Sequence, residues 1–577
     1  MIQGLHVLAP RHPLLTRWLW GAVVAVAIFT VTGAMKQMPS VVGDSGWGVL
    51  AAEQAARGLG GTPVAVRVAD PNDLSRSVLS PITWWAPSYG WAPYIFRSMG
   101  MNMGEALRTT FLVAWALAVL GWIGVFHQSG LGGARLAALA LVFVATRFVH
   151  SNTVTYEGGE LLLLATFPWA VLLTLFAWRP AEKVDAAGFS FSAGLILPVL
   201  YLVKYSAAIA AAAMVLAWIL QTVRGGVSWK RLAIFALGVG AGSLLLDAWG
   251  NLGAISPSWD RATRWEGLWF FNCLPLAPTD LDALLSWLFL HPSRPVAYGD
   301  LILVACGGIL FLALLGLALA RPADEKGVVS VSSCPVEIGL REKLARAWLA
   351  FRGLTPPQLL ALTLALAVPA VLAGMAVRGD AISVETRHLR PATLPGLALV
   401  FGWLVDRSRI GGGLGRWVAR GLLAGLFLVP LLYGTATLVD KTLFRAPSSR
   451  GLVGMCGVRL DELTQGVSAA EFREDLQRIG GGRRAVIWLP TPTIATELVE
   501  ERLIVTQANF ESISELSRLK YRGRPEGGVI VVYQDRLSRD GHLAVVLRAF
   551  RDIPASSWRQ QKLPRCPGWN AAVSSEQ

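Results

Sequence analysis

Long apolar stretches recur along this chain from near its start to about residue 440, and they constrain its fold more than any other feature. A helix needs about 20 mostly apolar residues to cross the hydrocarbon core of a bilayer. The mean hydropathy of +0.50 fits such helices, and the charged share of 16% lies well below the roughly 25% of a soluble chain. We predict a polytopic α-helical membrane protein with about eleven spans: 18–35, 109–126, 134–149, 161–178, 189–203, 205–223, 232–250, 301–320, 359–377, 391–405 and 417–439.

The first of these segments has two interpretations, a cleaved signal peptide or a permanent anchor. It is long for a signal peptide, it lacks a small-residue cleavage pattern, and many further segments follow it, so we predict an anchor. Segments 189–203 and 205–223 are joined with almost no loop at Lys204. They predict either two short, tilted spans or a broken helical hairpin.

Lys and Arg residues predict the orientation of these segments, because short cytoplasmic loops carry an excess of both. An N-terminus in the cytoplasm places the basic loops around 179–183, 224–231, 321–352 and 407–420 on the same side. The opposite loop 150–160 has no Lys or Arg. The formal net charge of +14 therefore reflects topology in the cytoplasmic (inner) membrane, and no nucleic-acid partner is needed to explain it.

Three large regions then face outward: the loops 36–108 and 251–299 and the tail 441–577, which follows a transmembrane domain over 1–440. In the tail, strand-like runs such as RRAVIWLP and GGVIVVYQ alternate with helix-like runs such as SAAEFREDLQRIG. This pattern predicts an extracytoplasmic α/β domain with a core of its own. Cys456 and Cys566 are the only cysteines of the tail, and in an oxidising compartment we predict that they form a disulfide, with two separate buried thiols as the alternative.

Asp44 follows the first apolar segment, in the stretch VVGDSGWGVLAAEQAARG. An acid in front of a helix-like stretch favours an N-cap, which accepts hydrogen bonds from the unpaired N–H groups of the helix. A carboxylate at the membrane surface also suits general-base catalysis, in which it takes a proton from an acceptor hydroxyl. A catalytic carboxylate must keep one oxygen free of the capping bond. The residues alone leave both roles open.

Aromatic and acidic residues occupy two of the outer loops. Trp84, Trp85 and Tyr89, in SPITWWAPSYGWAPYIF, predict either an aromatic belt at the membrane interface or a wall that stacks on a sugar ring or a lipid tail. Glu157 and Glu160 in the short outer loop either follow the charge rule or stand opposite Asp44. In the second case they bind substrate hydroxyls or a divalent cation such as Mg²⁺, Mn²⁺ or Ca²⁺.

Two basic groups are candidates for binding an anion. Lys204 lies between two apolar runs in LYLVKYSAAIAA, and it is a functional candidate unless its ammonium extends to the surface. Arg387, His388 and Arg390 lie at the outer mouth of a span, where basic residues oppose the charge rule. A phosphate between these two groups fits, because Arg binds phosphate as a fork. Pairing of the second group with Glu385 and lipid headgroups is the alternative.

The order of these motifs resembles that of the GT-C superfamily of membrane glycosyltransferases, in particular bacterial relatives of protein O-mannosyltransferases and of the aminoarabinose transferase of lipid A. Three stretches carry the resemblance over roughly residues 10 to 440: GDSGWGVLAAEQAARG, YLVKYSA and RHLRPATLPGLAL. The resemblance implies that a sugar passes from a polyprenyl-phosphate donor in the bilayer to a glycan, lipid or protein acceptor outside the membrane. It also implies these site residues: Asp44 as the base, Glu157 and Glu160 at the substrate or a metal, and Lys204 with Arg387, His388 and Arg390 at the lipid phosphate.

The chain departs from the family pattern at three points. Asp44 has no acidic neighbour, whereas many relatives carry two acids there. Ser80-Pro81-Ile82 stands where the family has Lys-Pro-Pro, and His388 replaces the usual Tyr. The resemblance therefore fixes neither metal dependence nor the donor sugar. Two other classes remain as alternatives: a transporter or flippase of lipid-linked or small solutes, and a non-catalytic membrane assembly protein.

Overall fold

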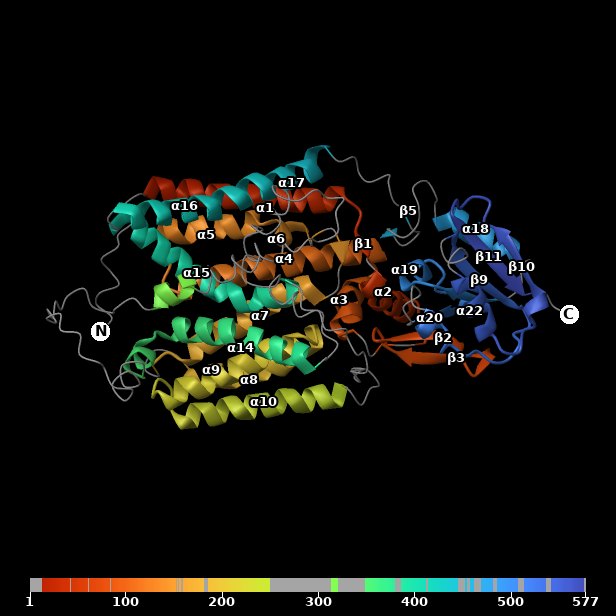
Figure 1. Ribbon diagram of the computed structural model, residues 1–577, viewed down its shortest axis with the longest axis horizontal. Coiled ribbons are helices and arrows are strands. Elements are labelled where there is room, and N and C mark those ends of the chain that lie inside the picture. Colours follow the sequence, from red (N-terminus) through yellow and green to blue (C-terminus); the bar gives the residue numbers. More distant parts are fainter. Residues whose placement is uncertain are drawn as a thin grey trace.

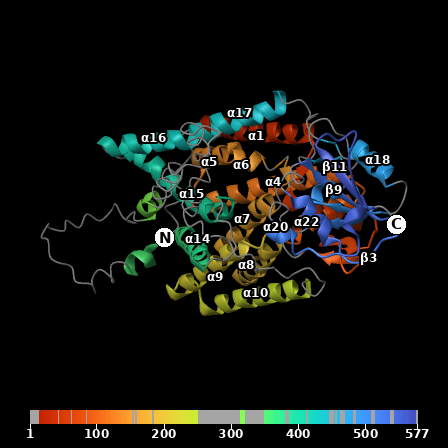
Figure 2. The ribbon, with the colours of Figure 1, turned by 45° about the vertical axis from the view of Figure 1, so that its right-hand side comes forward.

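The computed structural model of the chain describes residues 13–41, 43–60, 62–82, 85–151, 153, 155–156, 159–180, 185–249, 313–319, 348–378, 386–410, 413–444, 452–453, 457–460, 469–480, 485–506, 513–535 and 541–574. It shows a bundle of long helices and, at one end of this bundle, a domain built around a β-sheet (Figure 1). Segments of the first outer loop lie between the two. Figure 2, turned by 45°, shows the same arrangement.

Within the described residues, helices lie at the predicted spans, and the count of eleven stays a prediction. Among the described residues, five stretches are long and apolar enough to cross a bilayer: α1 (Pro13–Lys36), α4 (Met103–Gln128), α7 (Gly159–Ala177), α8 (Ala186–Val203) and Gly413–Val439, which contains α16 (Gly413–Val429) and α17 (Thr435–Val439). The other bundle helices are α5 (Gly133–Ala145), α9 (Ala207–Val223), α10 (Trp229–Trp249), α14 (Pro356–Arg378) and α15 (Thr386–Ile410). Lys204 ends α8, so α8 and α9 are two helices. Of the predicted span 301–320, residues 313–319 lie in the described part and are helical.

Two predicted spans differ from the structure. Segment 134–149 is not one helix, because α5 ends at Ala145 and the short helix α6 (Arg147–Ser151) follows. At this break, a Cβ added to Gly434 would lie 1.8 Å from the Ala145 carbonyl oxygen, so another backbone segment passes directly over it. That segment, η6 (Pro430–Gly434), is a π-helical turn that interrupts the predicted span 417–439. It starts at a proline, which has no N–H to donate to a helix.

Large aromatic side chains fill the centre of the bundle. Trp122 of α4 is fully buried, and its ring lies 6.2–6.3 Å from the rings of Phe126, Phe143 and Phe167. Its indole N–H donates to the carbonyl oxygen of Leu164 at 3.0 Å. Burial of an aromatic side chain stabilises a core most when its polar atom finds a partner in this way. These contacts join α4, α5 and α7.

The C-terminal domain contains a five-stranded sheet in the order β10–β11–β9–β7–β8. β7 (Val486–Leu489) is parallel to β8 (Arg502–Val505) on one side and to β9 (Val529–Gln534) on the other. β10 (Trp558–Lys562) and β11 (Trp569–Ser574) add antiparallel strands. Helices α18 (Ala469–Ile479) and α22 (His542–Ala549) belong to the same domain. The predicted α/β domain is confirmed.

The first outer loop supplies part of that domain's core. Its hairpin of β2 (Ala65–Asp70) and β3 (Asp73–Pro81) places Ala69 and Leu74 in the same apolar cluster as Trp488 of β7. The Leu74 amide donates to the Arg522 carbonyl oxygen at 2.8 Å. The C-terminal domain is therefore completed by residues that lie far upstream in the sequence.

The bundle has two chemically different ends. α1 runs toward the C-terminal domain from the opposite end (Figure 1). At that opposite end, Arg135 near the start of α5 lies 2.7 Å from Asp406 near the end of α15. Arg231 there donates to the carbonyl oxygen of Arg179 at 2.7 Å. The described parts of the basic loops predicted to be cytoplasmic thus lie at one end, and the C-terminal domain lies at the other.

Candidate active site

A small sheet joins the first outer loop, the acidic loop and the C-terminal segment. Its order is β4–β1–β6–β5. β1 (Ser40–Val41) lies between β4 (Thr155–Tyr156) and β6 (Arg459–Leu460) and is parallel to both. β5 (Leu452–Val453) is antiparallel to β6. Because neighbouring parallel strands end at the same edge, the segments that follow β1 and β4 start side by side.

Both of these segments are helices that begin with a predicted acid. α2 (Gly43–Ala56) follows β1, and Asp44 is its second residue. α7 follows β4, and Glu160 is its second residue. The strand register thus places the two helix starts at one edge of the sheet. α2 begins before Asp44, so Asp44 lies in the first turn and not at the predicted N-cap. An acid in this turn is favourable next to the positive end of the helix dipole.

Lys204 reaches the second of these acids. It follows the last residue of α8, and its Nζ lies 2.5 Å from Oε1 of Glu160. The two side chains are 8% and 7% exposed. Buried charges persist only as a pair, because one charge left alone in the interior costs several kcal/mol. Lys204 therefore does not extend to the surface of the bundle, which was the alternative to a functional role.

Tyr89 connects α2 with α7. It lies on α3 (Ser88–Arg97) and is 3% exposed. A Cβ added to Gly48 of α2 would lie 2.6 Å from the Tyr89 carbonyl oxygen. A Cβ added to Gly159, the first residue of α7, would lie 2.8 Å from Cε1 of the Tyr89 ring and 2.8 Å from the Val203 carbonyl oxygen. Only glycine fits at such distances, so α2, α3, α7 and the end of α8 meet at this tyrosine.

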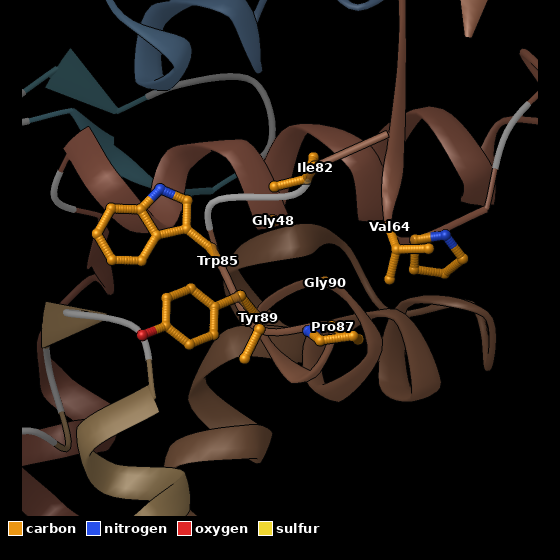
Figure 3. A pocket seen from close by; sticks show the side chains of 9 residues that line it. Gly48, Val64, Ile82, Trp85, Pro87, Tyr89 and Gly90 are labelled. Atoms are coloured by element: carbon orange, nitrogen blue, oxygen red, sulfur yellow. The ribbon is translucent and has the colours of Figure 1, made fainter. Parts of the chain in front are cut away.

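Trp85 extends the aromatic surface of Tyr89. The two rings stack with their centroids 5.7 Å apart and their planes 16° from parallel. Figure 3 shows them beside a small pocket next to Gly48 and Gly90. The cavity volume is about 10 Å³, which is about the room that one water needs. A sugar does not fit inside this pocket. Tyr89 is buried and Trp85 is partly exposed, so the aromatic wall for a substrate stays a prediction.

The other predicted residues are placed less completely. α15 begins at Thr386, so Arg387, His388 and Arg390 lie in its first turns, and the positions of their side chains are outside the described part. Because the last turns of α15 are at the Arg135 end of the bundle, its first turns lie at the end that bears the C-terminal domain. Trp84, Glu157 and Cys456 lie outside the described residues.

A divalent cation in the acidic loop is a further prediction. Within the described part of the chain, no three His, Cys, Asp or Glu side chains gather in a metal-binding group. Of the predicted acids, Glu160 has a described side chain, and its Oε1 is held by the Lys204 ammonium. The side chains of Asp44 and Glu157 lie outside the described part, so the divalent cation stays a prediction, and no step below depends on one.

Sequence analysis missed Glu53, a buried carboxylate in the last turn of α2. Its side chain is 1% exposed, and its oxygens lie 2.7 Å from Nε of Arg57 and 2.8 Å from Nε of Arg97. Burial raises the pKa of Glu53, but the hydrogen bonds and positive charges of Arg97 and Arg57 outweigh it, so the pKa lies below its ordinary value. The i, i+4 spacing of Glu53 and Arg57 was the available signal.

Cys566 lies between β10 and β11 and is a free, fully buried thiol in the structure. It packs in the same apolar core as Phe472 of α18 and Trp569 of β11. Burial raises the pKa of this thiol to about 12. Because Cys456 lies outside the described residues, its disulfide with Cys566 stays a prediction.

Comparisons with known proteins give a likeness in structure only. No protein-family model matches the chain, and no curated protein matches it. The crystal structure of ArnT from Cupriavidus metallidurans bound to undecaprenyl phosphate is similar at 13% identity and a TM-score of 0.50, over 97% of this chain and 100% of that one. The apo state of the same protein is similar at 13% identity and a TM-score of 0.50, over 97% of this chain and 99% of that one. The apo oligosaccharyltransferase of Archaeoglobus fulgidus is similar at 10% identity and a TM-score of 0.45, over 97% of this chain and 74% of that one.

These findings define the class of the fold. The chain shares its fold with ArnT, a polytopic bundle of long apolar helices followed by a C-terminal sheet domain. More particularly, the likeness to ArnT, the lipid A aminoarabinose transferase, extends over nearly the whole of both chains. The predicted resemblance is therefore confirmed at the level of the fold.

Proposed function

We propose that this chain transfers a sugar from a polyprenyl-phosphate-linked donor to an acceptor at the extracytoplasmic face of the cytoplasmic membrane, with Asp44 as the general base. One observation carries the proposal. The start of the Asp44 helix, the buried Glu160–Lys204 pair and Tyr89 gather at the end of the bundle that bears the C-terminal domain. The likeness in fold to ArnT, which was crystallised with undecaprenyl phosphate, supports a lipid-linked phosphate as part of the donor.

The proposed reaction is a substitution at the anomeric carbon of the donor sugar. A hydroxyl oxygen of the acceptor attacks this carbon, and the bond between the carbon and the phosphate oxygen breaks. The electron pair of that bond stays on the phosphate, and the polyprenyl phosphate leaves. Asp44 takes the hydroxyl proton as the new glycosidic bond forms. A general base of this kind contributes typically about 10²–10⁴-fold to the rate.

Lys204 supplies the positive charge that stabilises the leaving phosphate. Negative charge grows on the phosphate oxygen as the bond breaks, and a cation fixed in a water-poor site stabilises that charge strongly. Glu160 fixes the ammonium of Lys204 and offsets its charge before the donor binds. Arg387, His388 and Arg390, in the first turns of α15, add positive charge at the same end of the bundle.

A transporter fits the described residues less well. Transporters place polar residues near the middle of the membrane, often beside broken helices. In the described helices of this bundle, the charged residues lie toward the helix ends, apart from Arg420 in α16. The candidate site, the first outer loop and the C-terminal domain share one end. This asymmetry favours chemistry at one membrane surface.

Binding of the lipid phosphate tests the proposal without knowledge of the sugar. Purified full-length protein in detergent should bind undecaprenyl phosphate and should not bind undecaprenol, the matched alcohol without the phosphate. Lys204→Ala and Arg387→Ala should weaken binding of the phosphate. In proteoliposomes, the protein should then transfer or release sugar from one member of a panel of undecaprenyl-phosphate sugars. Equal binding of the phosphate and the alcohol would contradict the proposal.

A further inference from the structure

We infer that the C-terminal domain is a positioning part of the active site, because it contacts α2, the helix that carries Asp44, within the helix and directly before and after it. This inference rests on the proposed role of Asp44. Each contact joins a residue of the first outer loop to a residue more than four hundred positions downstream.

The first contact lies directly before α2. β1 pairs with β6, with Ser40 opposite Arg459 and Val41 opposite Leu460. A strand pair fixes its two backbones through hydrogen bonds, so the chain enters α2 from a defined position. Asp44 is three residues after Val41. Because this separation is short, the strand pair also limits where Asp44 can lie.

The second contact lies in the first turns of α2. Gly46 packs against α19 (Pro492–Ala495), the short helix that follows β7. A Cβ added to Gly46 would lie 2.9 Å from the backbone nitrogen of Thr493 and 3.1 Å from Cγ of Pro492. Thr493 is fully buried. The two backbones therefore touch without an intervening side chain, two residues after Asp44.

The third contact lies just beyond the last turn of α2. Nη1 of Arg57 is 2.8 Å from Oε1 of Glu500, which precedes β8. Nε of the same Arg57 binds the buried Glu53 of α2. Arg97 of α3 binds Glu53 from another side. One carboxylate thus connects α2 to α3, and Arg57 extends the connection to the C-terminal domain.

The second of these contacts lies at the edge of the five-stranded sheet on which α/β domains usually bind ligands. In open parallel sheets, ligands lie beyond the carboxyl ends of the strands, where the strand order reverses. β7 has β8 on one side and β9 on the other, so the order reverses at β7. The segment after its carboxyl end carries α19, which packs on α2. The C-terminal domain uses this edge to hold the catalytic helix.

Hydrogen exchange of α2 in the full-length protein tests the inference. Gly46→Ala introduces a Cβ that meets backbone atoms of Thr493, whereas the matched control Gly421→Ala adds one to an exposed helical glycine with open space around it. We expect amide exchange over 43–56 to rise about tenfold or more in Gly46→Ala and to stay unchanged in Gly421→Ala. With an active donor, kcat should fall about tenfold or more while KM for the donor changes less than about twofold, because misplacement of the base affects the chemical step.

A second variant keeps the test decisive if Gly46→Ala does not fold. Glu500→Ala removes an exposed partner of Arg57, and exchange in the last turn of α2 should rise about two- to fivefold, the range of an exposed ion pair. Unchanged exchange of α2 in the folded variants would overturn the inference. A wild-type protein that transfers no sugar would instead count against the proposed function, since the exchange data do not depend on activity.

Discussion

Lys204 and Glu160 lie 44 residues apart in the sequence, and in the structure the Lys204 ammonium nitrogen is 2.5 Å from a Glu160 carboxylate oxygen. Neither residue is in the middle of a helix. Glu160 is the second residue of α7, and Lys204 follows α8. The pair therefore lies where two spans end, directly beside Gly159 and Tyr89. A phosphate that reaches this point meets a cation whose position is already fixed.

The pair should show strong energetic coupling. Lys204→Met leaves the Glu160 carboxylate buried without a counter-charge, and removal of one partner of a buried pair costs about 3–5 kcal/mol. Glu160→Gln should also destabilise the protein, because it leaves the Lys204 ammonium buried without a counter-charge. We expect the double variant to lose less stability than the sum of the two single variants. Thermal unfolding in detergent measures this, with Lys230→Met, an exposed lysine of α10, as the control. Additive losses would mean that the two side chains do not interact.

Glu53 should make the stability depend on pH in the acid range. Its pKa is lower in the folded protein than its ordinary value, so the unfolded chain takes up a proton first as the pH falls. The ionised Glu53 therefore contributes stability above its ordinary pKa of about 4.3, and this contribution is lost as the pH falls through the folded pKa. The Tm difference between wild type and Glu53→Gln should be largest near neutral pH and should shrink below about pH 4.

A matched control for this experiment is Glu526→Gln, which replaces an exposed carboxylate in a turn. It should leave Tm nearly unchanged over the same pH range. If the Tm difference of Glu53→Gln is the same at acid and neutral pH, the Glu53 carboxylate is not ionised and paired with Arg97 and Arg57 as the structure shows.

Cys566 should behave as a buried free thiol. Its side chain is fully buried and its pKa is raised to about 12, so the reactive thiolate is scarce at pH 8. We expect iodoacetamide to label it slowly in the folded protein and completely after denaturation without a reductant. Peptide mass spectrometry separates it from the other cysteines. Labelling that requires a reductant would show instead that Cys566 is in a disulfide, and Cys456 would be the partner to test.

The sequence predicted the parts of the fold that depend on local pattern. Apolar length predicted the helices, and alternation of strand-like and helix-like runs predicted the C-terminal sheet. The break after Ala145 was not predictable, because it coincides with a backbone contact to Gly434, almost three hundred residues away. No sequence pattern predicted the hairpin of the first outer loop, whose Leu74 belongs to the core of the C-terminal domain.

The candidate site was predictable in its residues but not in its contacts. Asp44, Lys204 and Glu160 stood out because each is charged beside an apolar segment. No pattern in the sequence showed that Glu160 pairs with Lys204, since the pairing depends on how α7 and α8 pack. Glu53 was missed because a helix with Glu and Arg at i, i+4 is typical of a solvent-exposed face, and its burial comes from α3 and Arg97.

Sugar transfer by Asp44→Asn tests the central claim most directly. Asn has nearly the size of Asp and keeps an oxygen that accepts hydrogen bonds, but it cannot take the acceptor proton at neutral pH. Wild type and Asp44→Asn would be reconstituted in proteoliposomes with the undecaprenyl-phosphate sugar that wild type uses, after unfolding and undecaprenyl phosphate binding have shown that the variant is folded. We predict that transfer falls by about 10² or more, while binding of undecaprenyl phosphate stays within about threefold of wild type. A folded Asp44→Asn protein that transfers sugar at a near-normal rate would contradict the account.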